Sequence, residues 1–599
     1  MMPHTFHIPV LGLGYSIDTP LKVARYGISS VVSIVDDELT ERMRKYHAEL
    51  NHEPYHTIGK TENDSRALRI TAYLNLLHKL VSDQITALRT LSFDGPNDLC
   101  KYFELLPASS VLKFKYNVMR QMPQGIAKTR LQEELKRGIK PGDINVNIMS
   151  KVDKANFQNG IYTGDKNTDA LAAMRGFADS QLNSSVVISA GLNPRLFGYM
   201  EELECFRPSA DGHFQKKIIL KVSDYRSALI QAKVLAKKGL WVSEFRIESG
   251  LNCGGHAFAT EGLLLGPILQ EFKDNRPVLY LELLSLYQQA LQLKHGPVPA
   301  LSPVQLITVQ GGIGTAEEHE FLISYYGLDG TGWGSPFLLV PEATNVDEHT
   351  LTDLMKADES DYYLSNASPL GIPFNNFRKS TAERQRLERI ERGRPGSPCT
   401  KKYLCSNTEF TEEPICTASR EYQHLKIRQL KSSALPEEQL AYEINAITEK
   451  LCLCVGLCNS TYLSYNILKP REHQAVSICP GPNLAYFSGQ YSLKEMAAHI
   501  YGKQNLLSGV NRPNLFIKEF GLYVDYLKKE IEGTPEITAK KAKYFSKFYD
   551  QLINGINYYK ELIINSDLTK QIWDHDQIHR FEVISNKLFN SPQPIFTGL

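Results

Sequence analysis

The sequence predicts an α/β protein that folds as a (β/α)8 barrel, with a helical insertion after the second strand and a helical C-terminal region. Three observations favour this fold class. Short β-branched runs alternate with helical segments over residues 1–395, the alternation gives eight strand candidates, and polar and glycine-rich residues gather where those strands end. The alternative is an open doubly wound sheet, which requires only that the strand count is wrong by one or two.

The eight strand candidates follow one another in regular order. They are residues 6–14, 28–35, 143–150, 184–194, 216–224, 241–250, 304–314 and 327–340. Most are separated by helical segments, such as 226–239 and 316–327. The insertion spans about residues 40–140, and its apolar residues recur at helical spacing in the segment "RALRITAYLNLLHKLVSDQITALRTL". This pattern predicts an inserted helical hairpin or a lid.

The chain changes character after the eighth strand. Residues 379–398 form a charged helix with a Gly/Pro-rich joint, and residues 396–434 form a cysteine-bearing connector. Residues 435–599 are mostly helical. One helix is expected to begin near Pro436 and to continue through Cys458, with Cys454 and Cys458 on its apolar stripe.

Bulk composition limits the possible partners. The chain has 599 residues, of which 42% are hydrophobic and 22% charged, and its formal net charge is +1. We therefore expect a soluble protein without a nucleic-acid or membrane partner. No apolar run is long enough for a membrane span, and the N-terminus does not resemble a signal peptide, so a cytoplasmic location is expected. Ten cysteines in such a chain favour burial or metal ligation over disulfides.

Two glycine-rich turns follow the last two strands. Gly311, Gly312 and Gly314 precede a helix that begins near Thr315, and the second turn contains Gly332, Gly334 and Ser335. Backbone amides without side chains can approach an anion closely, and a helix start adds its positive end. The pair of turns predicts a phosphate site, whereas one such turn alone is equally explained by a need for positive φ.

In this strand order the chain resembles the nitronate monooxygenase (2-nitropropane dioxygenase) family of FMN-dependent barrels. It is also similar to the related flavin-dependent enoyl reductases of polyunsaturated fatty acid synthases. The resemblance covers about residues 6–340 apart from the insertion, and "GGIG" and "GWGSPF" match the two flavin-phosphate turns. It further implies flavin contacts for the first turn and for the end of the third strand. These contacts are assigned to Gly12, Gly14, Ser16 and Asn147.

The family carries a Gly-x-Glu-Ala-Gly-Gly-His motif after its sixth strand, and this chain has Gly250-Leu-Asn-Cys-Gly-Gly-His256 there. The resemblance makes His256 the catalytic base or acid and Gly254-Gly255 the turn that lets it face the flavin. Asn252 replaces the family's acidic residue. A histidine pKa near neutrality suits proton transfer beside a flavin, and the alternative is a histidine that caps a turn. Lys221, at the end of the fifth strand, is a candidate for a flavin contact. For Lys221, and for Glu248 at the end of the sixth strand, the alternative is a charged side chain exposed to solvent.

The connector contains Cys399, Cys405 and Cys416, and its Cys-x5-Cys spacing partly resembles the iron–sulfur segment of glutamate synthases. The third cysteine is farther away than in that family. Three thiolates are compatible with an iron–sulfur cluster, and the alternative is three free thiols in a loop. The histidines His575 and His579 lie one helical turn apart, but no third zinc ligand is evident near them.

Together these patterns predict an FMN-dependent oxidoreductase that acts on a small activated carbon acid or an enone-type acyl group. NADH or NADPH is an optional electron donor. Two alternatives remain open: an iron–sulfur/FMN reductase of the glutamate synthase type, and a flavin- or acyl-binding subunit without turnover. A homo-oligomer and a place in a larger synthase assembly are the partner arrangements considered.

Overall fold

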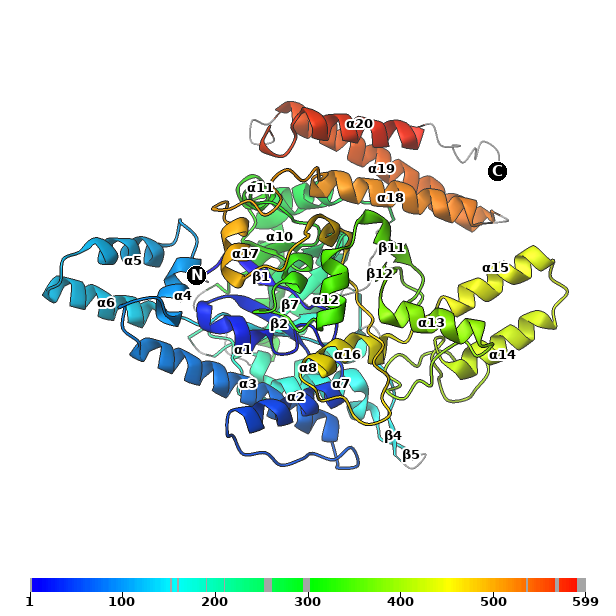
Figure 1. Ribbon diagram of the computed structural model, residues 1–599, viewed down its shortest axis with the longest axis horizontal. Coiled ribbons are helices and arrows are strands. Elements are labelled where there is room, and N and C mark those ends of the chain that lie inside the picture. Colours follow the sequence, from blue (N-terminus) through cyan, green and yellow to red (C-terminus); the bar gives the residue numbers. More distant parts are fainter. Residues whose placement is uncertain are drawn as a thin grey trace.

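The computed structural model of the chain describes residues 3–150, 153–158, 161–189, 191–209, 211–252, 261–294, 302–534, 537–565 and 570–589. At its centre is a closed barrel of parallel strands in the order β1-β10-β9-β8-β7-β6-β3-β2 (Figure 1). The strands are β1 (Phe6–Ile8), β2 (Ser29–Ser33), β3 (Ile144–Asn147), β6 (Ser184–Ile188), β7 (Lys216–Val222), β8 (Val242–Glu248), β9 (Leu306–Gln310) and β10 (Gly330–Gly332). Each predicted strand is present, so the (β/α)8 prediction is confirmed.

The strands are apolar because both of their faces are buried. In β6, Val186 and Ile188 belong to the hydrophobic cluster that joins the barrel to its outer helices. The residue between them, Val187, belongs to a separate cluster with Val31 and Ile219. This alternation of faces is the two-residue period of a strand, and it produces the nearly continuous apolar runs seen in the sequence.

Helices follow the strands and surround the barrel. They are α1 (Thr19–Val23), α7 (Asp169–Ala178), α8 (Pro194–Glu202), α9 (Tyr225–Lys237), α10 (Leu265–Leu293), α11 (Ala316–Tyr326) and α12 (Glu348–Met355). Side-chain caps mark several of their starts. Asp224 accepts from the amide of Ser227 in α9, and Thr315 with Glu318 forms a capping box in α11.

The expected insertion after the second strand is helical. It contains α2 (Asp37–Leu50), α3 (Ser65–Thr90), α4 (Asp98–Leu105), α5 (Val111–Gln121) and α6 (Ile126–Gly138). Of these, α3 packs against α2 and α7 and so forms part of the helical layer around the barrel. The pair α5 and α6 projects away from the barrel (Figure 1).

The chain after the barrel adds one small two-stranded sheet and further helices, and a second such pair lies between β3 and β6. The strands β11 (Tyr362–Ser365) and β12 (Phe374–Phe377) are antiparallel, as are β4 (Phe157–Gln158) and β5 (Ile161–Tyr162) nearer the N-terminus. The helices are α13 (Thr381–Glu391), α14 (Arg420–Lys431), α15 (Glu437–Thr448), α16 (Leu453–Ser464), α17 (Leu493–Ile500), α18 (Leu515–Glu532), α19 (Ala539–Asn565) and α20 (His575–Phe589). In Figure 1, α18, α19 and α20 form a layer over one side of the barrel.

The single helix predicted from Pro436 through Cys458 was wrong. It is interrupted between Thr448 and Leu453, because the amide of Leu451 donates to the carbonyl of Ala367 instead of continuing the helix. The thiols of Cys454 and Cys458 are nevertheless buried, as the apolar stripe indicated.

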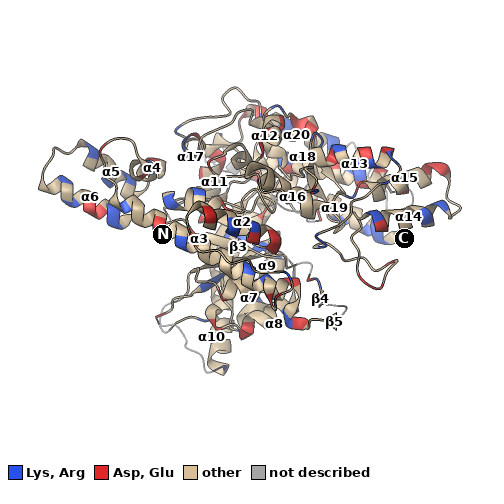
Figure 2. Cartoon of the chain, turned by 60° about the horizontal axis from the view of Figure 1, so that its bottom comes forward, with Lys and Arg blue, Asp and Glu red and all other residues tan. Residues whose placement is uncertain are grey.

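Charge is spread over the molecule. Figure 2 shows Lys and Arg interspersed with Asp and Glu on α2, α13 and α14, in keeping with the formal net charge of +1. In the described ranges, every helix is either too short or too polar to cross a membrane.

Candidate functional site

A polar cluster lies where β7, β8 and β9 end. The carboxylate of Glu248 accepts three hydrogen bonds at Oε1: from Lys221 Nζ at 3.1 Å, from Asn252 Nδ2 at 2.7 Å and from Gln310 Nε2 at 2.9 Å. The Lys221 and Glu248 side chains are only 12% and 10% exposed. We call Lys221, Glu248, Asn252 and Gln310 the mouth cluster, because it sits at the carboxyl end of the strands, where barrels place their active sites.

A second charged layer lies deeper in the barrel. Arg246 and Glu244, both on β8 and both buried, form a salt bridge at 2.8 Å. The nearby His7 Nε2 is 3.5 Å from Gln310 Oε1, and burial together with the Arg246 charge lowers the pKa of His7 well below its usual value. His7 is therefore neutral at physiological pH and connects the deep layer to the mouth cluster through Gln310.

The two predicted phosphate turns meet. Gly311, Gly312, Gly332, Gly334 and Ser335 line one cavity together with residues of two other loops, Asn252 and Asn483 among them. Within the described residues, the amides of Gly312 and Gly334 have no hydrogen-bond acceptor, so the donor chemistry suits an anion. The cavity measures about 10 Å³, however, which is about the space one water needs. A phosphate group therefore enters only if the two turns separate.

The helix start beside this cavity is already occupied by a side chain of the protein. Glu318 Oε2 accepts from the amides of Gly314 at 2.7 Å and Thr315 at 3.3 Å. Its other oxygen, Oε1, accepts a hydrogen bond from Arg512 Nη1 at 2.7 Å. Arg512 Nη2 donates to the carbonyl of Gly312 at 2.6 Å. An internal carboxylate thus takes the place that an external anion takes at many helix N-termini, which leaves Gly312 and Gly334 as the available donors.

The first glycine turn faces α16 in this conformation. The amide of Gly14 donates to the carbonyl of Leu457 at 2.9 Å, and a side chain at Gly14 would collide with Thr461. The hydroxyl of Ser16 accepts from the amide of Leu11 at 3.0 Å. The other predicted contact, Asn147, is the last residue of β3 and so lies at the carboxyl end of that strand.

The predicted catalytic turn, with Gly254, Gly255 and His256, lies outside the described residues. Its two flanks are described, and both are fixed by one side chain. Glu519 of α18 accepts from the amide of Gly250 at 2.9 Å and from the amide of Leu265 at 2.7 Å. Burial raises the pKa of Glu519 to about 7, although these two hydrogen bonds lower it.

The connector cysteines lie close together. Cys399 Sγ and Cys405 Sγ are 4.0 Å apart, and Cys416 lines the same cavity. Across the described part of the chain, no group of three or more His, Cys, Asp or Glu side chains is arranged to hold a metal ion. The iron–sulfur prediction therefore gains no support from the geometry, and the same holds for a zinc site at His575 and His579.

Several residues of the site were not singled out from the sequence, among them Gln310, Glu318, Arg512 and Glu519. Glu318 had a detectable signal, because "TAEE" places a glutamate three residues after a threonine at a helix start. Arg512 had none, since it reaches the Gly312 turn from a distant loop that only the tertiary fold brings near.

No family model matches the chain, and no curated protein matches it. Solved structures to which the chain is similar include the enoyl reductase domain of MlnA from Bacillus amyloliquefaciens, at 12% identity over 70% of this chain and 94% of that one, with a TM-score of 0.29. A mutant of FabK from Thermotoga maritima is 12% identical over 63% of this chain and 80% of that one, also with a TM-score of 0.29. Nitroalkane oxidase from Streptomyces ansochromogenes is 9% identical over 85% of this chain and 96% of that one, with a TM-score of 0.30. Likenesses this weak carry no argument about activity.

Proposed function

We propose that the chain is an FMN-dependent oxidoreductase that acts on a small activated carbon acid or an enone-type acyl group. One observation carries the proposal: the glycine turns after β9 and β10 line a common cavity at the carboxyl end of a closed (β/α)8 barrel. The amides of Gly312 and Gly334 are the donors for the flavin phosphate, and binding requires the two turns to move apart.

The mouth cluster supplies the polar groups next to the proposed ring site. Lys221 brings a positive charge that Glu248 holds in place, while Gln310 and Asn252 fix the carboxylate. His256 is the proposed base that removes a proton from the substrate carbon or returns one. A bound flavin supplies the electron-accepting ring, and the protein supplies orientation and electrostatics.

A larger cavity next to the mouth suits an acyl substrate. It measures about 730 Å³ and lies between the β11–β12 hairpin and helices α18 and α20. Its lining combines apolar side chains with basic ones and with fewer acidic ones: Leu364, Ile517, Leu522, Val583 and Ile584; Arg378, Lys518, Lys529, Arg580 and Lys587; and Glu359, Asp525 and Glu530. Asn375 lines this cavity and donates to the carbonyl of Asn252 at 3.2 Å, so one residue separates it from the mouth cluster. Such a lining accommodates a chain with an anionic end.

The test of the proposed base uses flavin-loaded protein. The substitution His256→Ala should leave FMN bound and slow its anaerobic bleaching by a substrate by about 100-fold or more, as expected for lost general-base catalysis. The control is His575→Ala on α20, which should bleach at the rate of the unaltered protein. Equal rates in the His256→Ala protein would contradict the assigned role. Bound flavin that stays oxidised with every donor and substrate offered would instead favour a binding subunit without turnover.

A further inference from the structure

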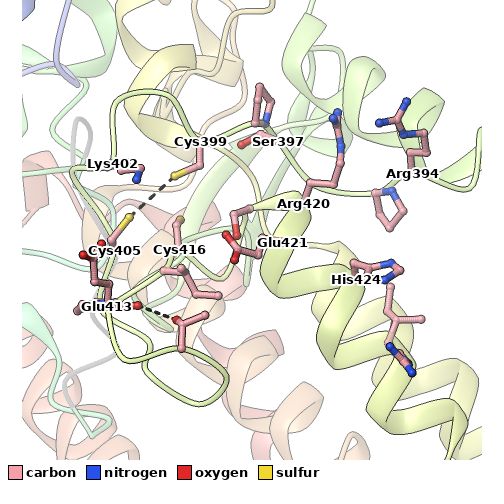
Figure 3. A pocket seen from close by; sticks show the side chains of 18 of the residues that line it. Arg394, Ser397, Cys399, Lys402, Cys405, Glu413, Cys416, Arg420, Glu421 and His424 are labelled. Carbon is pink, nitrogen blue, oxygen red and sulfur yellow. Dashed lines mark hydrogen bonds between the residues drawn. The ribbon is translucent and has the colours of Figure 1, made fainter. Parts of the chain in front are cut away.

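A third cavity lies away from the barrel mouth, and the proposed flavin reaction does not use it. It measures about 1040 Å³ and is bounded by the connector after α13 and by one side of α14 along its whole length. Figure 3 shows three thiols at one end of it, those of Cys399, Cys405 and Cys416. Basic side chains of α14 and the connector line the rest.

The charges around this cavity are unbalanced. Its basic residues are Arg394, Lys402, Arg420, Arg428 and Lys431, with His424 beside them, whereas its acidic residues are Glu413 and Glu421. Within the described part of the chain, the salt bridges include none of these arginines, lysines and glutamates. Positive charge that the protein does not neutralise attracts an anionic ligand.

Two polar groups at the cavity are buried without a partner. Ser397 is 3% exposed, and its hydroxyl makes no hydrogen bond to any described residue. The Nε atom of Arg420 is likewise buried and unpaired within the described ranges. Both residues line the cavity, and Figure 3 shows them to the right of the thiols. Both atoms are inaccessible to solvent, so they do not face the open cavity, and the charges alone favour an anionic ligand.

Two of the three thiols form a close pair. Cys399 Sγ and Cys405 Sγ are in contact at 4.0 Å, and Cys399 is the more exposed of the two. Cys399 has a φ of 53°, in the left-handed region that non-glycine residues seldom occupy. Backbone strain of this kind concentrates at functional sites.

We propose that this cavity binds a small anionic disulfide and that Cys399 and Cys405 reduce it by thiol–disulfide exchange. The Cys399 thiolate attacks one sulfur of the ligand, a mixed disulfide forms, and half of the ligand leaves as a thiolate that takes up a proton. The Cys405 thiolate then attacks Cys399 Sγ, which releases the second half as a thiol and leaves a protein disulfide. Two electrons pass from the dithiol to the ligand, and the two thiol protons end on its two halves.

The surroundings of the thiols predict a slow reaction at neutral pH. The hydrogen bond with Cys405 lowers the pKa of Cys399, but a hydrogen bond with Cys416, burial and the nearby Cys452 raise it to about 12 overall. The hydrogen bond with Cys399 and burial raise the pKa of Cys405, against the opposing charges of Lys154 and Lys402. Since the thiolate is the reacting form, the exchange rate should rise about tenfold per pH unit between pH 7 and pH 9.

The test compares two probes on the reduced, full-length protein. Oxidised glutathione carries net negative charge, and bis(2-hydroxyethyl) disulfide carries none. We expect oxidised glutathione to react about tenfold faster than the neutral probe, after each rate is divided by its rate with free cysteine. Peptide mapping by mass spectrometry should place the new disulfide between Cys399 and Cys405.

Variants separate the ligand contacts from the chemistry. The double substitution Arg428→Gln and Lys431→Gln should weaken the preference for the anionic probe severalfold, while the control Lys543→Gln on α19 should keep it. Cys405→Ser should halt the reaction at a glutathione adduct on Cys399. An equal normalised rate for both probes, or adducts spread over other cysteines such as Cys205, would overturn the proposal. Neither readout involves a flavin, so the outcome is independent of the proposed function.

Discussion

The carboxylate of Glu519, on α18, accepts a hydrogen bond from the amide of Gly250 at the end of β8, with Oε1 2.9 Å from the nitrogen. Its second oxygen accepts from Leu265, the first residue of α10. One side chain from the C-terminal helices therefore fixes both ends of the segment that carries the proposed catalytic turn. Tyr523, one turn further along α18, packs so closely on Gly250 that a side chain there would collide with its ring.

The raised pKa of Glu519 predicts that the stability of the protein depends on pH. Burial raises its folded pKa from 4.5 to about 7, so the folded protein keeps a proton that the unfolded chain loses between these values. The free energy of unfolding should therefore fall by roughly 3 kcal/mol as the pH rises from 4.5 to 7, and this contribution should be absent in Glu519→Gln. Urea denaturation of both proteins at pH 5 and pH 8 measures the difference. An identical pH dependence in the two proteins would contradict the buried, protonated state.

The Arg512–Glu318 pair should be important for stability because both side chains are buried, at 5% and 2% exposure. Arg512→Met leaves the Glu318 carboxylate without its charge partner and should lower the free energy of unfolding by about 3–5 kcal/mol. The double variant with Glu318→Gln should recover part of that loss. The exposed pair Lys587–Asp525 provides the control, since Lys587→Gln should cost less than about 1 kcal/mol. Similar losses for the two single variants would argue against the buried pair.

Gly312 is expected to tolerate no side chain. Its φ is +79°, and a Cβ there would lie 2.5 Å from Leu251 Cδ1. Gly312→Ala should therefore displace the turn and weaken FMN binding by at least about tenfold, with the affinity measured by fluorescence titration. Gly327→Ala is the matched control, because Gly327 also has a positive φ but nothing within 4 Å of the added carbon. If both variants bind FMN like the unaltered protein, this turn is not part of the flavin site.

The role of the 730 Å³ cavity is tested by filling it. Gly521 lies within α18 and lines the edge of this cavity. A Cβ added to Gly521 would meet only Ile584 Cδ1, at 3.5 Å. Gly521→Ala should fit and stabilise the helix by about 0.5–1 kcal/mol. Gly521→Leu should narrow the cavity and raise KM for long acyl substrates more than for short ones, without changing FMN affinity. Equal KM changes for both substrate lengths would place the substrate elsewhere.

The barrel could be predicted because each of its strands is a short apolar run followed by glycines or polar residues, as at Val187 and Gly312. The convergence of the turns after β9 and β10 followed from the strand order alone. The break after Thr448 could not be predicted, since it depends on a hydrogen bond between Leu451 and the distant Ala367. The hydrogen bonds from Arg512 to Gly312 and from Gly250 to Glu519 also depend on tertiary packing. Such contacts produce no periodic pattern in the local sequence, so they could not be predicted.

The central claim is that the two glycine turns open to hold the phosphate of FMN. It is tested most directly by titrating the purified, flavin-free chain with FMN in a calorimeter, while the flavin absorbance spectrum is recorded on the same samples. The account predicts saturable binding of one FMN per chain with a perturbed flavin spectrum. A titration without heat of binding, together with a spectrum identical to that of free FMN, would contradict it.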